Sequence, residues 1–166
     1  MKELIADDRA RVESYFDTSE EIKELLDLAI LNWENTPESE KYIQAALKAA
    51  PESLNVAIAA YRYFFYKQNF TKALQAAEII VDRISTLQNL PSDWENLKAI
   101  LISDRDNPHI RLYLNAYTAS GFVLTKLKQF DRAYQILSRV NQIDSLNEFG
   151  AKTMLDILNN PGDEEY

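Results

Sequence analysis

The chain contains no cysteine, which excludes disulfides, thiolate metal sites and thiol nucleophiles. Glycine occurs only 3 times and proline 5 times in 166 residues. Three glycines are too few to build either a phosphate-binding G-x-x-x-x-G-K-S/T loop or a dinucleotide-binding G-x-G-x-x-G turn. No two of the 18 basic residues are adjacent, and the formal net charge is −8. Nucleic acids and anionic membranes need clustered cations, so we expect neither as a partner.

Long hydrophobic runs are also missing. Asp7 and Asp8 lie where a signal peptide would need its apolar segment. The longest uncharged stretch, residues 112–125, is too short and too polar to span a bilayer, so we expect a cytoplasmic protein. His109 is the single histidine, and no serine or carboxylate is spaced to form a triad with it. We therefore expect no catalytic residue, no metal, no cofactor and no enzymatic activity.

Between the sparse helix breakers the chain is filled with alanine, leucine, lysine, glutamate and glutamine, which favour helix. We predict an all-α fold. Pro51 and Pro91 are expected to end the helices before them, because proline disfavours a helical preceding residue. The about eight predicted helices cover residues 19–34, 37–50, 53–68, 70–89, 92–103, 108–127, 130–143 and 146–159.

Polar residues mark the predicted helix starts. A capping box joins a hydroxyl at the cap to a glutamate three residues later, and each satisfies an orphan amide. A cap residue followed by proline at the first helical position is a second start signal. The boxes are Thr18 with Glu21, Ser92 with Glu95 and Ser145 with Glu148, and the proline starts are Thr36-Pro37 and Asn107-Pro108.

Residues 54–85 align without gaps with residues 114–145, which indicates an internal repeat. Lys72 and Ile80 also have similar counterparts, Arg132 and Val140. The matches exceed what average composition gives by chance. The identical pairs are Leu54/Leu114, Asn55/Asn115, Ala59/Ala119, Phe70/Phe130, Ala73/Ala133, Gln75/Gln135 and Ser85/Ser145.

Residues 128–145 and 69–80 resemble the second helix of the tetratricopeptide repeat, a unit of about 34 residues built from two antiparallel helices. The resemblance implies an aromatic residue before the turn that packs on the first helix, and an alanine where two helices approach closely. Gly121 falls on the small position of the first helix, whereas Tyr61 occupies that position in the other repeat and predicts wider spacing there. The aromatic positions are Phe70 and Phe130, and the alanine positions are Ala73 and Ala133.

This resemblance implies a TPR-like array of antiparallel helix pairs over residues 18–160, with an irregular helical insert at 86–113. The repeats are a degenerate one at 20–53, then 54–85 and 114–147, followed by a capping helix at 148–160. Trp94 in the insert is expected to be largely buried against the array. Residues 1–17 are expected to form an arm or a short helix, and residues 161–166 a disordered acidic tail.

A fainter resemblance links the chain to small repeat proteins encoded among nitrogen-fixation genes. It rests on Pro51-Glu-Ser-Leu54 leading to Ala60-Tyr-Arg-Tyr-Phe-Phe, and on Leu90-Pro-Ser-Asp-Trp94. It implies no particular biochemical role.

The run Tyr61-Arg-Tyr-Phe-Phe-Tyr66 covers more than one helical turn, so its rings point in several directions. Two interpretations stay open: the rings line a partner-binding surface, or they fill space against the insert. In tetratricopeptide arrays the first helices line a concave groove, and the resemblance implies which residues would face it. They are Asn55, Ile58, Arg62, Phe65 and Tyr66 in one repeat and Asn115, Thr118, Phe122 and Lys126 in the other.

The leading functional hypothesis is a non-catalytic scaffold that binds a protein or peptide in this groove. Lysine and amide side chains that clamp a chaperone's terminal carboxylate are replaced here by Ile58, Thr118 and Phe122, which argues against that subtype. The first alternative is a chaperone or assembly factor for one client. The second is a structural homodimer whose aromatic surface is its own interface.

Overall fold

The computed structural model describes residues 18–160, and within that range the chain forms eight α-helices and no strand. The all-helical prediction is confirmed for these residues, with helices in the expected order. The expectations for residues 1–17 and 161–166 lie outside the described range. The helices are α2 (Glu20–Leu31), α3 (Thr36–Ala49), α4 (Leu54–Tyr66), α5 (Phe70–Leu87), α6 (Trp94–Ser103), α7 (Pro108–Lys126), α8 (Phe130–Ile143) and α9 (Ala151–Asn159).

Side-chain caps explain where the helices begin, although several expected caps are displaced by one residue. Asn107 accepts a hydrogen bond from the His109 amide at 2.9 Å, which confirms the start predicted at Pro108. Ser53 and Asn69 cap α4 and α5 in the same way, whereas α8 and α9 begin without a side-chain cap. At three other starts a polar residue next to the expected one is the cap. The observed caps are Ser19 where Thr18 was expected, Asn35 where Thr36 was expected, and Asp93 where Ser92 was expected.

The scarcity of glycine has a visible consequence at the helix ends. Gln68 (φ 58°) and Lys128 (φ 59°) take up the left-handed conformation that glycine normally supplies at this position. They occupy equivalent places in the two aligned segments, so α4–α5 and α7–α8 are joined by the same turn. In each turn the amide three residues past the helix donates to a carbonyl of the last helical turn: Asn69 to Phe64 at 2.8 Å, and Gln129 to Leu124 at 2.9 Å.

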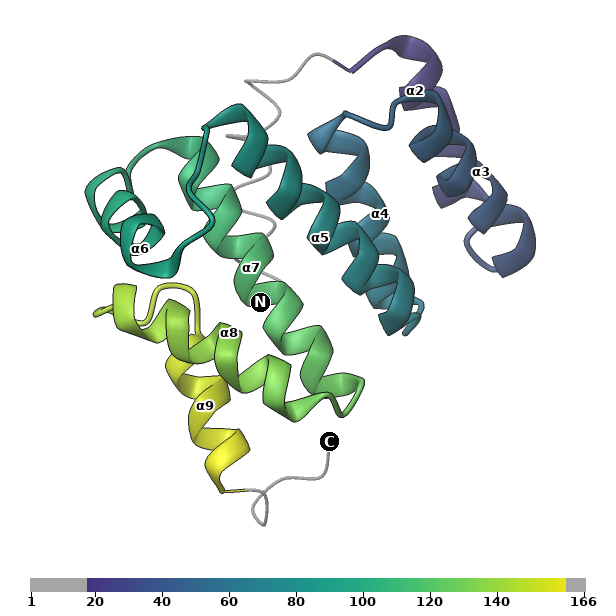
Figure 1. Cartoon of the computed structure of the whole chain (residues 1–166). Coiled ribbons are helices and arrows are strands. Elements are labelled where there is room, and N and C mark those ends of the chain that lie inside the picture. Colours follow the sequence, from purple (N-terminus) through teal and green to yellow (C-terminus); the bar gives the residue numbers. More distant parts are fainter. Residues whose placement is uncertain (1–17, 161–166) are drawn as a thin grey trace.

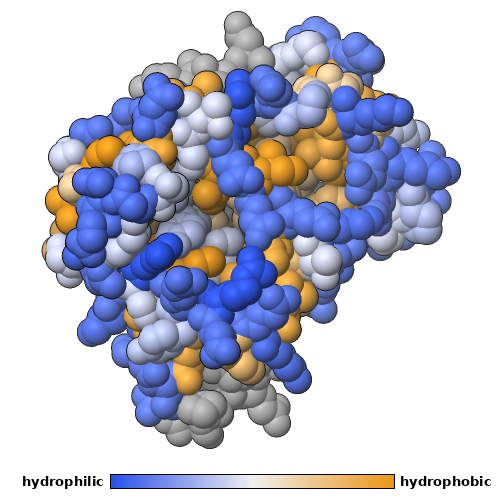
Figure 2. Space-filling view, in the orientation of Figure 1, coloured by the Kyte–Doolittle hydropathy of each residue, from blue (hydrophilic) through white to orange (hydrophobic). Residues whose placement is uncertain are grey.

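The helices pack in chain order, as Figure 1 shows. α2 pairs with α3, α4 with α5, and α7 with α8, and a short turn joins the members of each pair. α5 also packs along α7, and α9 packs on α8, so the last two pairs and α9 form one continuous array. The first pair touches this array mainly through α3 and α4. Figure 2 shows hydrophilic residues over most of the same face, with hydrophobic residues in separate patches, one of them over α4.

Two close helix approaches hold the repeat pairs together. Ala73 on α5 and Ala133 on α8 are both 0% exposed, as the repeat register predicts. On α7, a Cβ built on Gly121 would lie 3.0 Å from the Leu137 side chain of α8. Gly121 therefore leaves room for Leu137, and α7 and α8 interlock at this point.

The Gly121 site is inverted in the other pair. Its equivalent Tyr61 is buried on α4, and the residue equivalent to Leu137 is Ala77 on α5. Tyr61 and Ala77 lie in one buried cluster together with Ala76. A large residue on the first helix thus meets small residues on the second, whereas the order is reversed in α7–α8. This exchange of volume accounts for Tyr61 at the position where the other segment has Gly121.

The insert packs on the array through α6, whose Leu97 and Leu101 are buried in the core. Trp94 is partly buried and packs against the same core cluster, as expected for an insert that packs on the array. Its ring lies against α8 with the Arg139 guanidinium 5.0 Å from the ring centre, and its Nε1 donates to the Gln142 side chain at 3.3 Å. Polar atoms of α8 therefore cover one side of the Trp94 ring.

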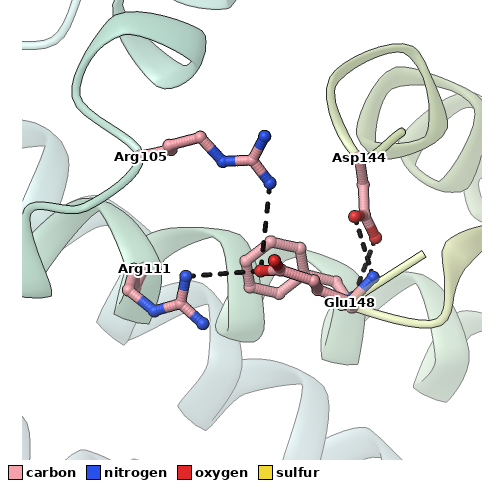
Figure 3. Close-up of polar contacts among 5 residues, drawn as sticks. Arg105, Arg111, Asp144 and Glu148 are labelled. Atoms are coloured by element: carbon pink, nitrogen blue, oxygen red, sulfur yellow. Dashed lines mark hydrogen bonds and ion pairs between the residues drawn. The ribbon is translucent and has the colours of Figure 1, made fainter. Parts of the chain in front are cut away.

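The segment between α8 and α9 also corrects the prediction. Ser145 and Glu148 form no capping box, and α9 starts at Ala151, after Gly150 in the left-handed region (φ 79°). Asp144, which is 3% exposed, instead accepts hydrogen bonds from the amides of Glu148 and Phe149, both at 2.8 Å. Figure 3 shows this turn beside the ion pairs that Glu148 forms with Arg111 at 3.4 Å and Arg105 at 3.8 Å.

The Gly121 contact makes a prediction about paired substitutions. Gly121→Ala should destabilise the protein by about 1 kcal/mol, because overpacking against Leu137 outweighs the better helix propensity of alanine. In a Leu137→Ala background the same change should be neutral or stabilising, because most of the clash is gone. Urea unfolding of the four chains measures the coupling between the two positions. Equal effects of Gly121→Ala in both backgrounds would show that the two helices do not interlock here.

The Asp144 turn makes a second prediction. Asp144→Asn should lower the free energy of unfolding by about 1–2 kcal/mol, because an amide can accept at only one of its two polar atoms. Asp156→Asn on the exposed part of α9 is the matched control and should change little. Thermal unfolding at neutral pH compares the two. An Asp144→Asn variant as stable as the control would contradict the role given to the buried carboxylate.

Candidate functional site

A cluster of rings joins α4 to α7, with Phe65 at its centre. Around Phe65 the ring centroids lie within contact distance, in the offset and edge-to-face arrangements that aromatic pairs favour. We call the surface that carries Arg62, Phe65, Tyr66, Phe122 and Lys126 the aromatic face. The centroid of Phe65 is 5.8 Å from those of Tyr61 and Phe122, 5.9 Å from that of Phe70 and 6.0 Å from that of Tyr66.

The six-residue run on α4 divides between core and surface. Tyr61, Tyr63 and Phe64 are buried at 3%, 6% and 2% exposure, so these rings fill the interior. Phe65 is half-buried and Tyr66 is 43% exposed. Three of the five rings in the run therefore lie in the core and two reach the surface.

Two cations flank the exposed rings. Lys126 of α7 lies over the Phe122 ring, with its Nζ 5.4 Å from the ring centre. Arg62 of α4 is half-buried and lies one turn before Tyr66 on the same side of the helix. Within residues 18–160 Arg62 forms no hydrogen bond, ion pair or ring contact. The aromatic face therefore offers both apolar area and donor groups to a partner.

Contacts join four of the nine expected groove residues, namely Phe65, Tyr66, Phe122 and Lys126. Arg62 lies one turn before Tyr66 on α4 and completes the aromatic face. Asn55 lies at the N-terminal end of α4, where its side-chain amide donates to the Thr18 hydroxyl at 2.7 Å. Ile58 packs against the core, and Asn115 is half-buried on α7. Thr118 is 4% exposed, and its hydroxyl donates to the Leu114 carbonyl of its own helix at 2.7 Å. Thr118 therefore cannot contact a partner in this conformation, contrary to the expectation for the groove.

Sequence reasoning missed the contribution of Tyr61 and Phe70 to the ring cluster. Phe70 does pack on the first helix through Phe65, as the repeat implies. Phe130, its equivalent in the other repeat, is 47% exposed, so the same expectation was wrong there. The residue equivalent to Phe65 in α7 is Thr125, which gives Phe130 no ring to pack against. Comparing the two repeats position by position would have shown this difference.

Tyr61 has an unusual hydroxyl. Its oxygen is buried and has no hydrogen-bond partner within the described part of the chain. Burial, with a smaller contribution from Tyr66, raises the pKa of Tyr61 well above its ordinary range. The hydroxyl thus stays protonated at neutral pH beneath the aromatic face.

Residues 18–160 contain no group of three or more histidine, aspartate or glutamate side chains placed to hold a metal ion. Between the same bounds, each helix is too short or too polar to cross a lipid bilayer.

Comparison with known proteins gives one informative relative. The chain is 28% identical over 123 residues to the uncharacterized 19.8 kDa protein in the nifW 5′ region of Azotobacter chroococcum mcd 1, and the match covers 72% of this chain and 69% of that protein. The resemblance to a protein encoded in a nitrogen-fixation region is therefore supported. No protein-family profile matches the chain, and no solved structure matches it.

The buried hydroxyl of Tyr61 leads to a prediction on stability and pH. Tyr61→Phe should stabilise the protein by about 1 kcal/mol at neutral pH, because it removes an unsatisfied buried polar group and keeps the ring. In the wild type, Tyr61 ionises near pH 10 when the chain is unfolded but only at higher pH when it is folded. Stability is therefore fully present below pH 10 and is lost as the pH rises above it, and the variant should lose less.

Tyr134→Phe is the matched control, because Tyr134 is 50% exposed on α8. Melting temperatures measured from pH 7 to pH 11 would compare the two variants with the wild type. A lower melting temperature for Tyr61→Phe at neutral pH would show that the hydroxyl has a stabilising partner.

Proposed function

We propose that the chain is a non-catalytic scaffold of the tetratricopeptide kind that binds a protein or peptide segment on the aromatic face. The observation that carries this proposal is the contact of Phe65 with Phe122, which joins α4 and α7 beneath an exposed Tyr66. Rings and arginines are enriched among residues that dominate binding energy. A ring cluster at the surface fits that description, and so does Arg62 beside it, which has no ion-pair partner within residues 18–160.

The repeat assignment has its own support. The two aligned segments fold into the same helix–turn–helix, with left-handed Gln68 and Lys128 in matching turns. Ala73 and Ala133 are fully buried at the positions where the repeat needs a close approach of helices. In such an array the first helices, here α2, α4 and α7, line the concave side. The aromatic face would then form the central part of the groove.

The partner belongs, we propose, to the proteins that cells use for nitrogen fixation. The support is the likeness to the uncharacterized protein in the nifW 5′ region, which carries no stated activity. Affinity capture from lysates of nitrogen-fixing cells and of cells supplied with ammonium, followed by mass spectrometry, would identify the partner. A scaffold partner should be captured stoichiometrically, and a chaperone client should lose solubility when the gene is deleted.

The homodimer alternative uses the same surface, and the molecular mass in solution distinguishes it from a monomeric scaffold. Light scattering on the purified chain would give a monomer mass for a scaffold and twice that mass for a dimer. A dimer that the variants below dissociate would assign the aromatic face to self-association.

Removal of two side chains from the aromatic face should weaken partner binding. Arg62→Ala combined with Tyr66→Ala is expected to reduce affinity for the captured partner by about thirty-fold or more, since one hot spot contributes about 2 kcal/mol. The melting temperature should stay nearly unchanged, because neither side chain is in the buried core. Calorimetric titration and thermal unfolding give the two quantities.

The matched control removes the same two residue types elsewhere. Arg132→Ala combined with Tyr134→Ala takes an arginine and an exposed tyrosine from α8 and should leave affinity unchanged. If the aromatic-face variant is folded and binds as tightly as the wild type, the binding site lies elsewhere. If it unfolds, the two residues serve the core.

A further inference from the structure

We infer that the aromatic face selects an acidic polypeptide segment, one in which carboxylates flank an apolar or aromatic side chain. This inference rests on the proposed function and specifies the chemistry of the partner. It starts from the distribution of charge. The chain as a whole has a formal charge of −8, yet α4 and α7 contain no aspartate and no glutamate. Their charged residues at neutral pH are all cations: Arg62, Arg111 and Lys126.

These three cations differ in their partners. Arg111 forms an ion pair with Glu148 at 3.4 Å, at the end of α7 beside α9. Lys126 contacts only the face of the Phe122 ring within residues 18–160, and Arg62 has no polar or ring partner there. Elsewhere in the same range many cations are paired with carboxylates, including Lys72 with Glu40, Arg83 with Glu52 and Arg132 with Glu78. Among the described residues, Arg62 and Lys126 are thus two cations without a carboxylate partner on one surface of an acidic protein.

Their positions fit a particular ligand. α4 and α7 run in the same direction, since the turns that follow them lie at the same side of the array (Figure 1). Arg62 therefore lies on the N-terminal side of the Phe65–Phe122 contact, and Lys126 lies on its C-terminal side. An apolar side chain placed on the two rings would have a cation to either side. The residues next to that apolar side chain in the ligand would be attracted most strongly to the two cations if they were aspartate or glutamate.

The partial burial of Arg62 and Lys126 strengthens the preference for acidic residues in the ligand. Arg62 and Lys126 are both half-buried beside rings, where water screens charge less than at an open surface. Arginine binds a carboxylate through two parallel hydrogen bonds, so Arg62 adds geometry as well as charge. Two separated cations are too few for a nucleic-acid backbone, which needs a run of phosphate contacts. A polypeptide ligand therefore fits this face better than a polyanion.

The test is a selection from a random twelve-residue peptide library displayed on phage, with the full chain as bait. The wild type should enrich peptides in which aspartate or glutamate flanks phenylalanine, tyrosine, tryptophan or leucine. The double reversal Arg62→Glu with Lys126→Glu should instead enrich lysine and arginine at the flanking places. Lys48→Glu with Lys152→Glu changes the net charge equally on exposed parts of α3 and α9, and should select the same peptides as the wild type.

A synthetic peptide of the selected sequence should bind the wild type at least ten-fold more tightly than its Asn/Gln counterpart, with the difference shrinking at high salt. Enrichment without a preference for acidic residues, still abolished by Phe122→Ala, would overturn the charge inference and leave the proposed binding face intact. Enrichment that is unaffected by Phe122→Ala would overturn both. Circular dichroism on each variant confirms that loss of binding is not loss of fold.

Two other occupants are separable outcomes. Residues 1–17 also combine acidic and aromatic residues, and they join α2 at Thr18, which is bonded to Asn55. If the chain lacking residues 1–17 stays folded and binds the synthetic peptide at least ten-fold more tightly than the full chain does, the chain's own segment is the ligand. That result would overturn the proposal of a separate partner. A dimer in light scattering that the Arg62→Glu and Lys126→Glu variant dissociates would assign the face to a second copy.

Discussion

The close approach of the two helices in each repeat pair is the constraint on which the rest of this structure depends. Two helices can approach this closely only where a small residue faces a bulky one. The chain meets this requirement in two ways. In α7–α8 the first helix supplies Gly121 and the second supplies Leu137, whereas in α4–α5 the first helix supplies Tyr61 and the second supplies Ala77. The bulky residue lies on the second helix in one pair and on the first helix in the other, and the two helices are closely packed in both pairs.

The inverted arrangement in α4–α5 explains why the rings gather at one place. With alanines on α5 taking little space, the rings of α4 can enter the core, and Tyr61 does so with its hydroxyl unsatisfied. Phe65, one turn later, then stacks on Tyr61 and reaches across to Phe122 of α7. The aromatic face is therefore supported from below by core packing. Its rings are held in position by the same contacts that close the helix pair.

The sequence predicted the elements well because the breakers are few and the helix formers are continuous. Boundaries were harder, since neighbouring polar residues compete for the same cap, as Ser19 and Asn35 did with Thr18 and Thr36. The start of α9 was missed because buried Asp144 binds the amides that Ser145 was expected to serve. Among the groove residues, Thr118 failed because a hydroxyl in a helix can bond to its own backbone and stay buried. Neither effect has a signature in residue spacing.

What distinguishes the two repeats is more informative about function than what they share. Several of their identical residues, such as Ala73 and Ala133, are buried packing positions. Two of the differences bear on the aromatic face: Phe65 is equivalent to the buried Thr125, and Arg62 is equivalent to Phe122. Because α4 and α7 are neighbouring first helices, these unlike residues meet on one face instead of repeating along the array. A single ring cluster flanked by two cations therefore requires both repeats, and neither repeat could form this surface alone.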